Sequence, residues 1–225
     1  MFSITTSLTE ADIQQAVKLA KANYVELIEK HIRPGGPTGS LCQTTVEVEV
    51  RAYLEEALSP EFGMKITAVL AKDPDHNLIG FAIALGGELE TDCGLNYAVV
   101  HSGYRRQGIL RAMLKEVQGR FQFIGLACKI DKVPYYESLG FRITGPQSAQ
   151  VAMSWGLDKP HADMSVLGFH NDPDIQLAKG AFERLNGAKT PGIYRKMKAM
   201  QVEQSEKVLA YLDKRAKGVS HAEAV

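Results

Sequence analysis

Between residues 64 and 156 the sequence alternates between short apolar runs and segments with helical spacing. Apolar runs bounded by turn residues predict strands, and apolar residues that recur every three or four positions predict helices. The predicted strands are 66–71, 78–85, 95–101, 121–128, 141–144 and 151–155; the predicted helices are 108–119 and 133–139. This order predicts an α/β (mixed α+β) fold in which helices pack on a mixed sheet.

The N-terminal part of the chain is predicted to be helical. Thr9 is a suitable N-cap for one amphipathic helix over residues 10–32, and the Pro-Gly-rich residues 34–37 end it. A second helix is predicted over 44–58. Its residues 45–50 are β-branched and alternate, which leaves a strand as the alternative, but the continuation RAYLEEAL favours a helix.

The C-terminal third also has helical spacing. Helices are predicted over 171–185 and 190–217, and the second of these carries an apolar side that other residues must cover. We therefore expect a domain over residues 1–158 and a helical C-terminal extension over 159–225. The extension is expected to pack on that domain or on a second subunit.

Charge gives a weak indication of where the extension packs. The chain has 26 Lys and Arg and 26 Asp and Glu, so its net charge does not favour nucleic acid or an anionic membrane as a partner. Residues 187–225 carry eight basic and four acidic residues, a net of +4; residues 1–62 carry five basic and nine acidic residues, a net of −4. This match predicts that the last helix lies across the first two helices of its own chain or of a homodimer partner. Interleaved acidic residues and the lack of base-stacking aromatics argue against nucleic acid.

Cysteine usage and the N-terminal sequence bear on compartment. Cys42, Cys93 and Cys128 are odd in number and far apart, so neither a disulfide framework nor a metal site is predicted. The first residues lack the basic and apolar regions of a signal peptide, and no apolar stretch approaches ~18 residues. A cytoplasmic location without membrane association is expected.

A basic turn with a glycine lies between the predicted strand 95–101 and the predicted helix 108–119. The first amides of a helix lack internal partners and lie at the positive end of the helix dipole. Gly108 permits close backbone approach, and Arg105, Arg106 and Arg111 add positive charge. These features predict a diphosphate cradle, with an ordinary turn carrying solvated arginines as the alternative. The GxxxxGK[ST] and GxGxxG patterns are both absent.

A second motif follows about 25 residues later, and the pair resembles the GNAT superfamily of acyl-CoA-dependent N-acyltransferases. The family loop (Q/R)-x-x-G-x-(G/A) is similar to Arg105-Arg106-Gln107-Gly108-Ile109-Leu110, and its Y-E-x-x-G-F signature is similar to Tyr136-Glu137-Ser138-Leu139-Gly140-Phe141. The resemblance covers about residues 1–156. It implies a mostly antiparallel sheet of about six to seven strands flanked by helices. Two positions depart from the family: Leu110 replaces a Gly or Ala, and Lys129 replaces a common Asn.

The resemblance implies transfer of an acetyl (acyl) group from acetyl-CoA to a primary amine, without a metal. The residues implied in cofactor binding are Val99, Val100, Arg105, Arg106, Gln107, Gly108, Ile109, Leu110, Arg111 and Tyr136. Amides of the loop would hold the pyrophosphate, and the backbone of Val99 and Val100 would lie beside the pantetheine arm. Tyr136 would protonate the departing thiolate, with Tyr135 less favoured and a packing role as the alternative.

A base that accepts the amine proton is harder to locate. Glu88, Glu90 and Asp92 precede the central predicted strand, where the family often places its base, and Glu88 and Glu90 are our candidates. An exposed loop without a catalytic role is the alternative for each of them. His101 is expected to be structural.

The sequence is compatible with several acceptors and with two classes of protein. Small-molecule amines and peptide or protein amines all fit. In this family the choice is set by the first two helices, by the loop between them (here residues 31–44) and by the region of the sixth and seventh strands. The alternative to an enzyme is a non-catalytic acyl-CoA-binding sensor or scaffold. Leu110 and Lys129 slightly favour this non-catalytic alternative, and the presence of Tyr136 argues against it.

Overall fold

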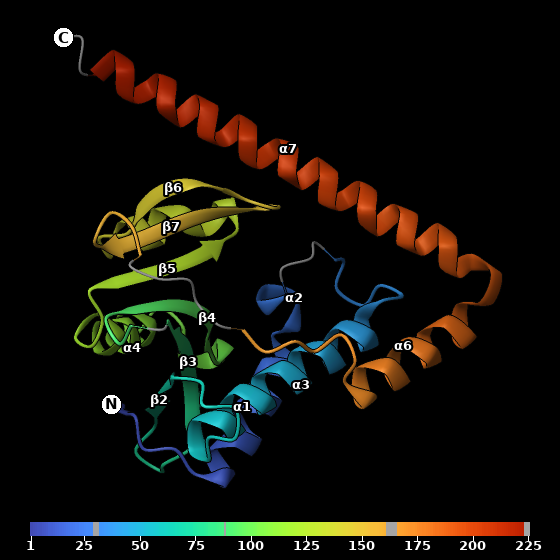
Figure 1. Cartoon of the computed structure of the whole chain (residues 1–225), viewed down its shortest axis with the longest axis horizontal. Coiled ribbons are helices and arrows are strands. Elements are labelled where there is room, and N and C mark those ends of the chain that lie inside the picture. The colour runs from blue at the N-terminus through green and yellow to red at the C-terminus, as the bar shows by residue number, and fades with distance from the viewer. Residues whose placement is uncertain (29–31, 88, 161–165, 223–225) are drawn as a thin grey trace.

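The computed structural model describes residues 1–28, 32–87, 89–160 and 166–222, and it contains a seven-stranded sheet with the order β1-β2-β3-β4-β5-β7-β6 (Figure 1). The strands are β1 (Ser3–Thr5), β2 (Ile66–Lys72), β3 (Leu78–Gly86), β4 (Asp92–Val100), β5 (Phe123–Cys128), β6 (Arg142–Gln147) and β7 (Gln150–Gly156). Neighbouring strands pair antiparallel except β4 and β5, which are parallel. The predicted fold class is confirmed. The short β1, at the edge of the sheet, was not predicted.

The helices are α1 (Glu10–Ala22), α2 (Tyr24–Leu27), α3 (Gly39–Leu58), α4 (Ile109–Gln118), α5 (Val133–Glu137), α6 (Pro173–Asn186) and α7 (Thr190–Ala222). Two predictions for the N-terminal part need correction. The single helix over 10–32 is wrong, because the chain leaves the helix at Asn23, whose side-chain amide donates to the Leu19 carbonyl at 2.8 Å. Residues 29–31 lie outside the described part. The strand alternative for 45–50 is wrong, because those residues lie within α3, which begins at Gly39 rather than at residue 44.

Two hydrophobic clusters lie on the two faces of the sheet. The first includes buried residues of α4 such as Met113 and Leu114, together with Met153 of β7. The second includes α1 and α3 residues such as Val17 and Leu54. Every residue of β3 is buried because both faces of that strand are covered. Among the described residues, no helix is long and apolar enough to cross a membrane.

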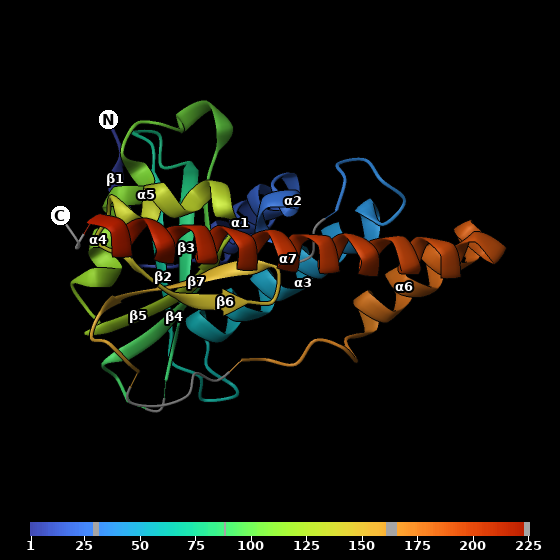
Figure 2. The same ribbon diagram turned by 90° about the horizontal axis from the view of Figure 1, so that it is seen from above.

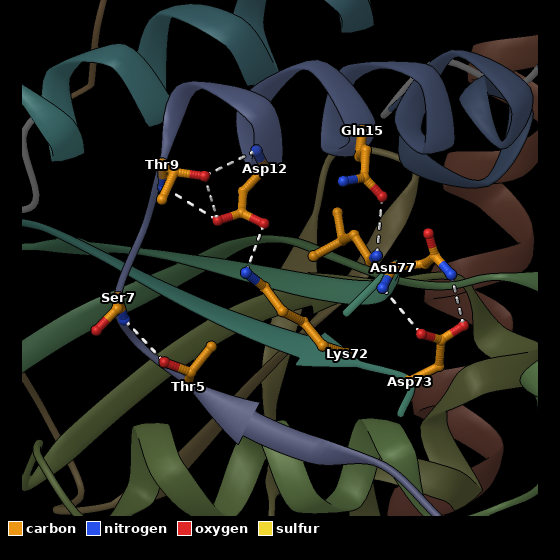
Figure 3. Close-up of polar contacts among 9 residues, drawn as sticks. Thr5, Ser7, Thr9, Asp12, Gln15, Lys72, Asp73 and Asn77 are labelled. Carbon is orange, nitrogen blue, oxygen red and sulfur yellow. Dashed lines mark hydrogen bonds and ion pairs between the residues drawn. The ribbon is translucent and has the colours of Figure 1, made fainter. Parts of the chain in front are cut away.

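Buried polar contacts fix the start of α1 on the sheet (Figure 3). Thr9 and Asp12 form a capping box, in which the Asp12 amide donates to Thr9 Oγ1 at 3.2 Å and the Thr9 amide donates to Asp12 Oδ2 at 3.1 Å. The Asp12 carboxylate also lies 2.7 Å from the Lys72 ammonium of β2. Burial acts to raise the pKa of Asp12, but hydrogen bonds from Lys72 and Thr9 outweigh it and hold that pKa below its usual value.

Replacing Asp12 with Asn is expected to lower the free energy of unfolding at pH 7 by about 2 kcal/mol, because charge-assisted hydrogen bonds are lost. A carboxyl with a depressed folded-state pKa stabilises the fold above its unfolded pKa, here 3.8. That contribution disappears as the pH falls through the folded-state value. Denaturant titrations at pH 7 and pH 3 should therefore show a difference from the parent that shrinks at low pH. Asp75→Asn, at an exposed turn position, is the control. Equal stability of Asp12→Asn and the parent at pH 7 would contradict the expectation.

The C-terminal helices contact different parts of the domain. α6 packs against α3, and α7 packs against β6 and β7. Figures 1 and 2 both show the C-terminal half of α7 running along β6 and β7, while α6 and the start of α7 project beyond the sheet. Val208 is buried in the first cluster, and Gln201 donates to Ser148 Oγ at 3.1 Å. The prediction that this helix lies across the first two predicted helices of its own chain is therefore wrong for α7.

Candidate functional site

The central parallel pair of strands separates after three residues. β4 and β5 pair only where Asp92, Cys93 and Gly94 face Phe123, Ile124 and Gly125. β4 nevertheless continues to Val100 and β5 to Cys128. Asn96 is skipped in the register with β3, which marks a bulge, and this residue is exposed although its neighbours in β4 are buried. A cleft of about 1490 Å³ opens between the two strands, and Asn96 lines it.

The predicted diphosphate loop borders this cleft. A 3-10 turn, η1 (Ser102–Tyr104), follows β4, and α4 begins just after Gly108. Arg106 and Gly108 both have positive φ, 63° and 80°. A Cβ at Gly108 would meet no protein atom within 4 Å, so open space lies directly over the backbone at the start of α4. A glycine with open space above it at the start of a helix, where the first amides lack internal partners, fits a diphosphate group.

Most residues predicted to bind the cofactor line the cleft. They are Val99, Val100, Arg105, Arg106, Gly108, Ile109, Leu110, Arg111 and Tyr136. Gln107 is absent from the lining. Leu110, where the family has Gly or Ala, also packs against the first hydrophobic cluster. Its side chain is therefore accommodated partly by the core.

Two basic residues of the cleft hold α2 in place. Arg105 donates from Nε to the Val100 carbonyl at 3.2 Å and from Nη2 to Asn23 Oδ1 at 2.7 Å. Lys129 donates to the Val25 carbonyl at 2.7 Å. The lysine that replaces the family's Asn therefore connects the end of β5 to α2. Arg105 likewise connects the end of β4 to the junction between α1 and α2, a contact the sequence did not predict.

Tyr136 lies in α5, and its ring packs edge-to-face on Tyr135 and Phe141, with centroid distances of 5.7 and 5.6 Å. The Phe141 amide donates to the Tyr136 carbonyl at 3.1 Å, and Gly140 between them has a φ of 86°. The second motif is thus a tight helix end that holds the tyrosine against the sheet. Burial, followed by the nearby Cys128, raises the pKa of Tyr136. Its hydroxyl therefore remains protonated at neutral pH.

Of the two predicted bases, the structure describes Glu90, and it does not bring that residue into the cleft. Glu88 lies outside the described residues. The side chain of Glu90 is 85% exposed, lies 3.5 Å from Lys65 and does not line the cleft. Asp92 is buried where β4 and β5 pair, and Thr91 Oγ1 donates to it at 2.9 Å. His101 Nδ1 accepts from the Gly103 amide at 3.2 Å, which agrees with a structural role.

A carboxylate that the sequence analysis did not select does line the cleft. Glu49 of α3 is half-buried there and accepts a hydrogen bond from the hydroxyl of Tyr97 in β4. A signal for it exists in the sequence. Glu49 lies three residues after Val46 and four before Tyr53, so it falls on the apolar face of the helix, where a carboxylate is unusual.

Residues 39–154, which include most of the sheet and the loop before α4, match the family "Acetyltransferase (GNAT) domain". The match covers half of the chain, and the protein belongs to the GNAT acetyltransferase family. PaiA N-acetyltransferase from Thermoplasma acidophilum, solved in complex with coenzyme A, is similar in structure. Its TM-score is 0.57 at 14% identity, over 70% of this chain and 99% of that one. A candidate acetyltransferase from Acinetobacter baylyi ADP1 gives a TM-score of 0.51 at 13% identity, over 72% of this chain and 97% of that one. No curated protein matches the sequence.

Proposed function

We propose that this protein is an N-acyltransferase that transfers an acetyl group from acetyl-CoA to a primary amine by direct attack in a ternary complex. The acceptor is a small-molecule, peptide or protein amine. The observation that carries the proposal is one cleft, between the separated strands, that is lined by both the start of α4 and the protonated Tyr136. The coenzyme A complex of the similar PaiA acetyltransferase supports the choice of co-substrate.

Residues 106–111 would bind the pyrophosphate through the backbone at the start of α4, with Arg106 and Arg111 adding charge. Val99 and Val100 line the cleft on the edge of β4 that β5 leaves unpaired, which suits the pantetheine arm. Arg105 would act at a distance from the ligand, because its guanidinium already bonds to Val100 and Asn23.

Tyr136 would supply the proton for the leaving thiolate. The amine must be neutral to attack, because its lone pair forms the new C–N bond while the C–S bond breaks. A thiolate with a pKa near ~8.5 then leaves, and a protonated phenol in the cleft can donate to it. As the thiolate leaves, the nitrogen that has formed the new C–N bond loses a proton to Tyr136. This proton replaces the one that Tyr136 donated.

Gly108→Asp is expected to abolish CoA binding, because it places bulk and negative charge in the open space above the start of α4. CoA at ~100 times its dissociation constant should stabilise the parent by ~2.7 kcal/mol, a rise in melting temperature of about 5–10 °C. The variant should show no rise. Gly108→Ala is the control, because alanine must adopt the same positive φ at this position as aspartate but adds no negative charge. An unchanged melting temperature of the parent in millimolar CoA would overturn the assignment of the co-substrate.

Thiol release from acetyl-CoA with a panel of amines tests the transfer itself. The proposal expects release that depends on both acetyl-CoA and an amine, with the acetylated amine formed in equal amount. CoA-dependent stabilisation without thiol release on any amine would instead identify a non-catalytic acyl-CoA-binding module.

A further inference from the structure

The gap between β4 and β5 joins the two faces of the sheet. α4, whose start borders the cleft, packs on the face of the first hydrophobic cluster. Leu27 and Ile28, at the end of α2, line the same cleft but pack against the second cluster, on the opposite face. The proposed diphosphate site lies at the start of α4, which leaves the α2 side of the cleft for the amine. Glu26, Leu27 and Ile28 therefore form a wall of the cleft on the acceptor side.

Each of the two separated strands is followed by a cation that reaches this segment. Arg105, in the loop after β4, donates to Asn23 Oδ1, just before α2, at 2.7 Å. Lys129, the residue after β5, donates from Nζ to the Val25 carbonyl of α2, also at 2.7 Å. The Lys129 ammonium lies 3.9 Å from the Glu26 carboxylate as well, and its side chain is 18% exposed. α2 is thus attached to the chain at the ends of both strands.

These attachments matter because α2 buries little of its own surface. The helix has four residues, and none of them is buried. Burial of apolar surface therefore stabilises its position only weakly, and an isolated helix of this length is not stable in water. The last carbonyls of a helix also lack partners within it. Lys129 supplies one of them with a charge-assisted hydrogen bond.

We propose that Lys129 is a positioning residue for the acceptor, because it holds in place the wall formed by Glu26, Leu27 and Ile28. This inference rests on the proposed function and deepens it by naming a residue that governs acceptor binding. Lys129 acts through α2 and not on acetyl-CoA or the reacting atoms. Its removal should therefore weaken binding of the amine and leave the chemical step intact.

Lys129→Met in the full chain tests the attachment of α2, because methionine keeps an unbranched side chain but has no ammonium to donate. The Leu27 and Ile28 amides donate within α2 to the carbonyls of Asn23 and Tyr24. Hydrogen exchange followed by NMR should show both amides exchanging about 10-fold faster than in the parent, because α2 opens more often.

Steady-state kinetics of the same variant test the effect on the acceptor. The probes are 1,4-diaminobutane, 2-phenylethylamine and glycine amide, and the amine that the parent acetylates fastest is used. Its KM should rise about 10-fold in Lys129→Met, while kcat and the KM for acetyl-CoA stay within about three-fold of the parent. A variant that merely disturbed the fold would not separate these three quantities.

Lys132→Met is the matched control, because it removes the same charge from the same cleft. The Lys132 ammonium pairs with Asp131 at 2.9 Å and reaches Glu26 only at 3.8 Å, and exposed ion pairs contribute little. Exchange of the α2 amides and the KM for the amine should stay within about two-fold of the parent. Equal effects of the two substitutions would overturn the proposal, because the charge of the cleft and not the bond to α2 would then be responsible.

The remaining outcomes separate the inference from the function on which it rests. Unchanged exchange at Leu27 and Ile28 in Lys129→Met would overturn the attachment. Faster exchange with an unchanged KM for the amine, or with an equal loss in kcat and in the KM for acetyl-CoA, would overturn the role in acceptor binding. Faster exchange in the variant, with no acetyl transfer by the parent to any of the three amines, would support the role of Lys129 in holding α2 and contradict the proposed function.

Discussion

Tyr136→Phe is expected to lower turnover about 10²–10⁴-fold, while CoA affinity stays within a few-fold of the parent. The variant loses only the hydroxyl, and the ring contacts with Tyr135 and Phe141 remain. The thiolate must then take its proton from water in a cleft whose walls are partly apolar. Steady-state kinetics with an amine that the parent acetylates, together with CoA-dependent melting shifts, measures both quantities.

Tyr135→Phe is the matched control for this prediction. Tyr135 is adjacent in α5, also lines the cleft and is 36% exposed, so it can be replaced with little change in packing. Its variant should retain turnover within a few-fold. If Tyr136→Phe retains turnover and Tyr135→Phe loses it, the donor is Tyr135. If both retain it, water supplies the proton.

Local pattern was enough to predict most of the sheet. The apolar runs of β2 and β3 lie within one residue of their predicted bounds, because both strands are buried and bounded by turn residues. The break at Asn23 was missed because apolar spacing continues through it; a side-chain bond to Leu19 and the contact with Arg105, 82 residues away, hold the chain there. The first depends on local rotamer choice and the second on the tertiary fold, and neither is encoded in periodicity.

The same difference between local sequence motifs and tertiary contacts applies to the candidate site. The loop before α4 and the end of α5 are contiguous motifs, so the sequence located Gly108 and Tyr136 directly. Glu49 lies more than 40 residues before the start of β4 in the sequence, and its position depends on how α3 packs on the sheet. The separation of β4 from β5 depends on pairing, which an apolar run does not specify. Glu90 was selected because it is close to β4 in sequence, yet its side chain is exposed beside Lys65 and does not line the cleft.

Charge was a poor guide to the C-terminal helix. The +4 and −4 segments predicted docking on the N-terminal helices of the same chain or of a second subunit. The first alternative is wrong, in keeping with the small contribution of individual exposed ion pairs, and the second stays a prediction. Apolar burial determines the position instead: Val208 is 1% exposed in the first cluster, with Tyr211 and Leu212 packed against it. The ion pair between Arg215 of α7 and Glu137 of α5 lies beside this contact.

Val208→Asp is expected to lower the free energy of unfolding by about 4 kcal/mol, because it buries a carboxylate among apolar residues. For a chain of this size that corresponds to a fall in melting temperature of about 8–16 °C. Leu209→Asp is the control. Leu209 is adjacent to Val208 but is 56% exposed, so this change should lower the free energy of unfolding by no more than about 0.5 kcal/mol. Circular dichroism melts of the three proteins provide the comparison.

The form of the Val208→Asp transition also tests the division into a domain over 1–158 and an extension over 159–225. If α7 and the sheet unfold together, the whole transition moves to lower temperature, because α7 completes the cluster that contains Met153 of β7. If the extension is an independent appendage, helical signal is lost at low temperature while the main transition stays at the parent's temperature. Burial of Val208 in a cluster shared with α4 and β7 favours the first outcome. A main transition at the parent's temperature would show that residues 1–158 keep their stability without α7 in place.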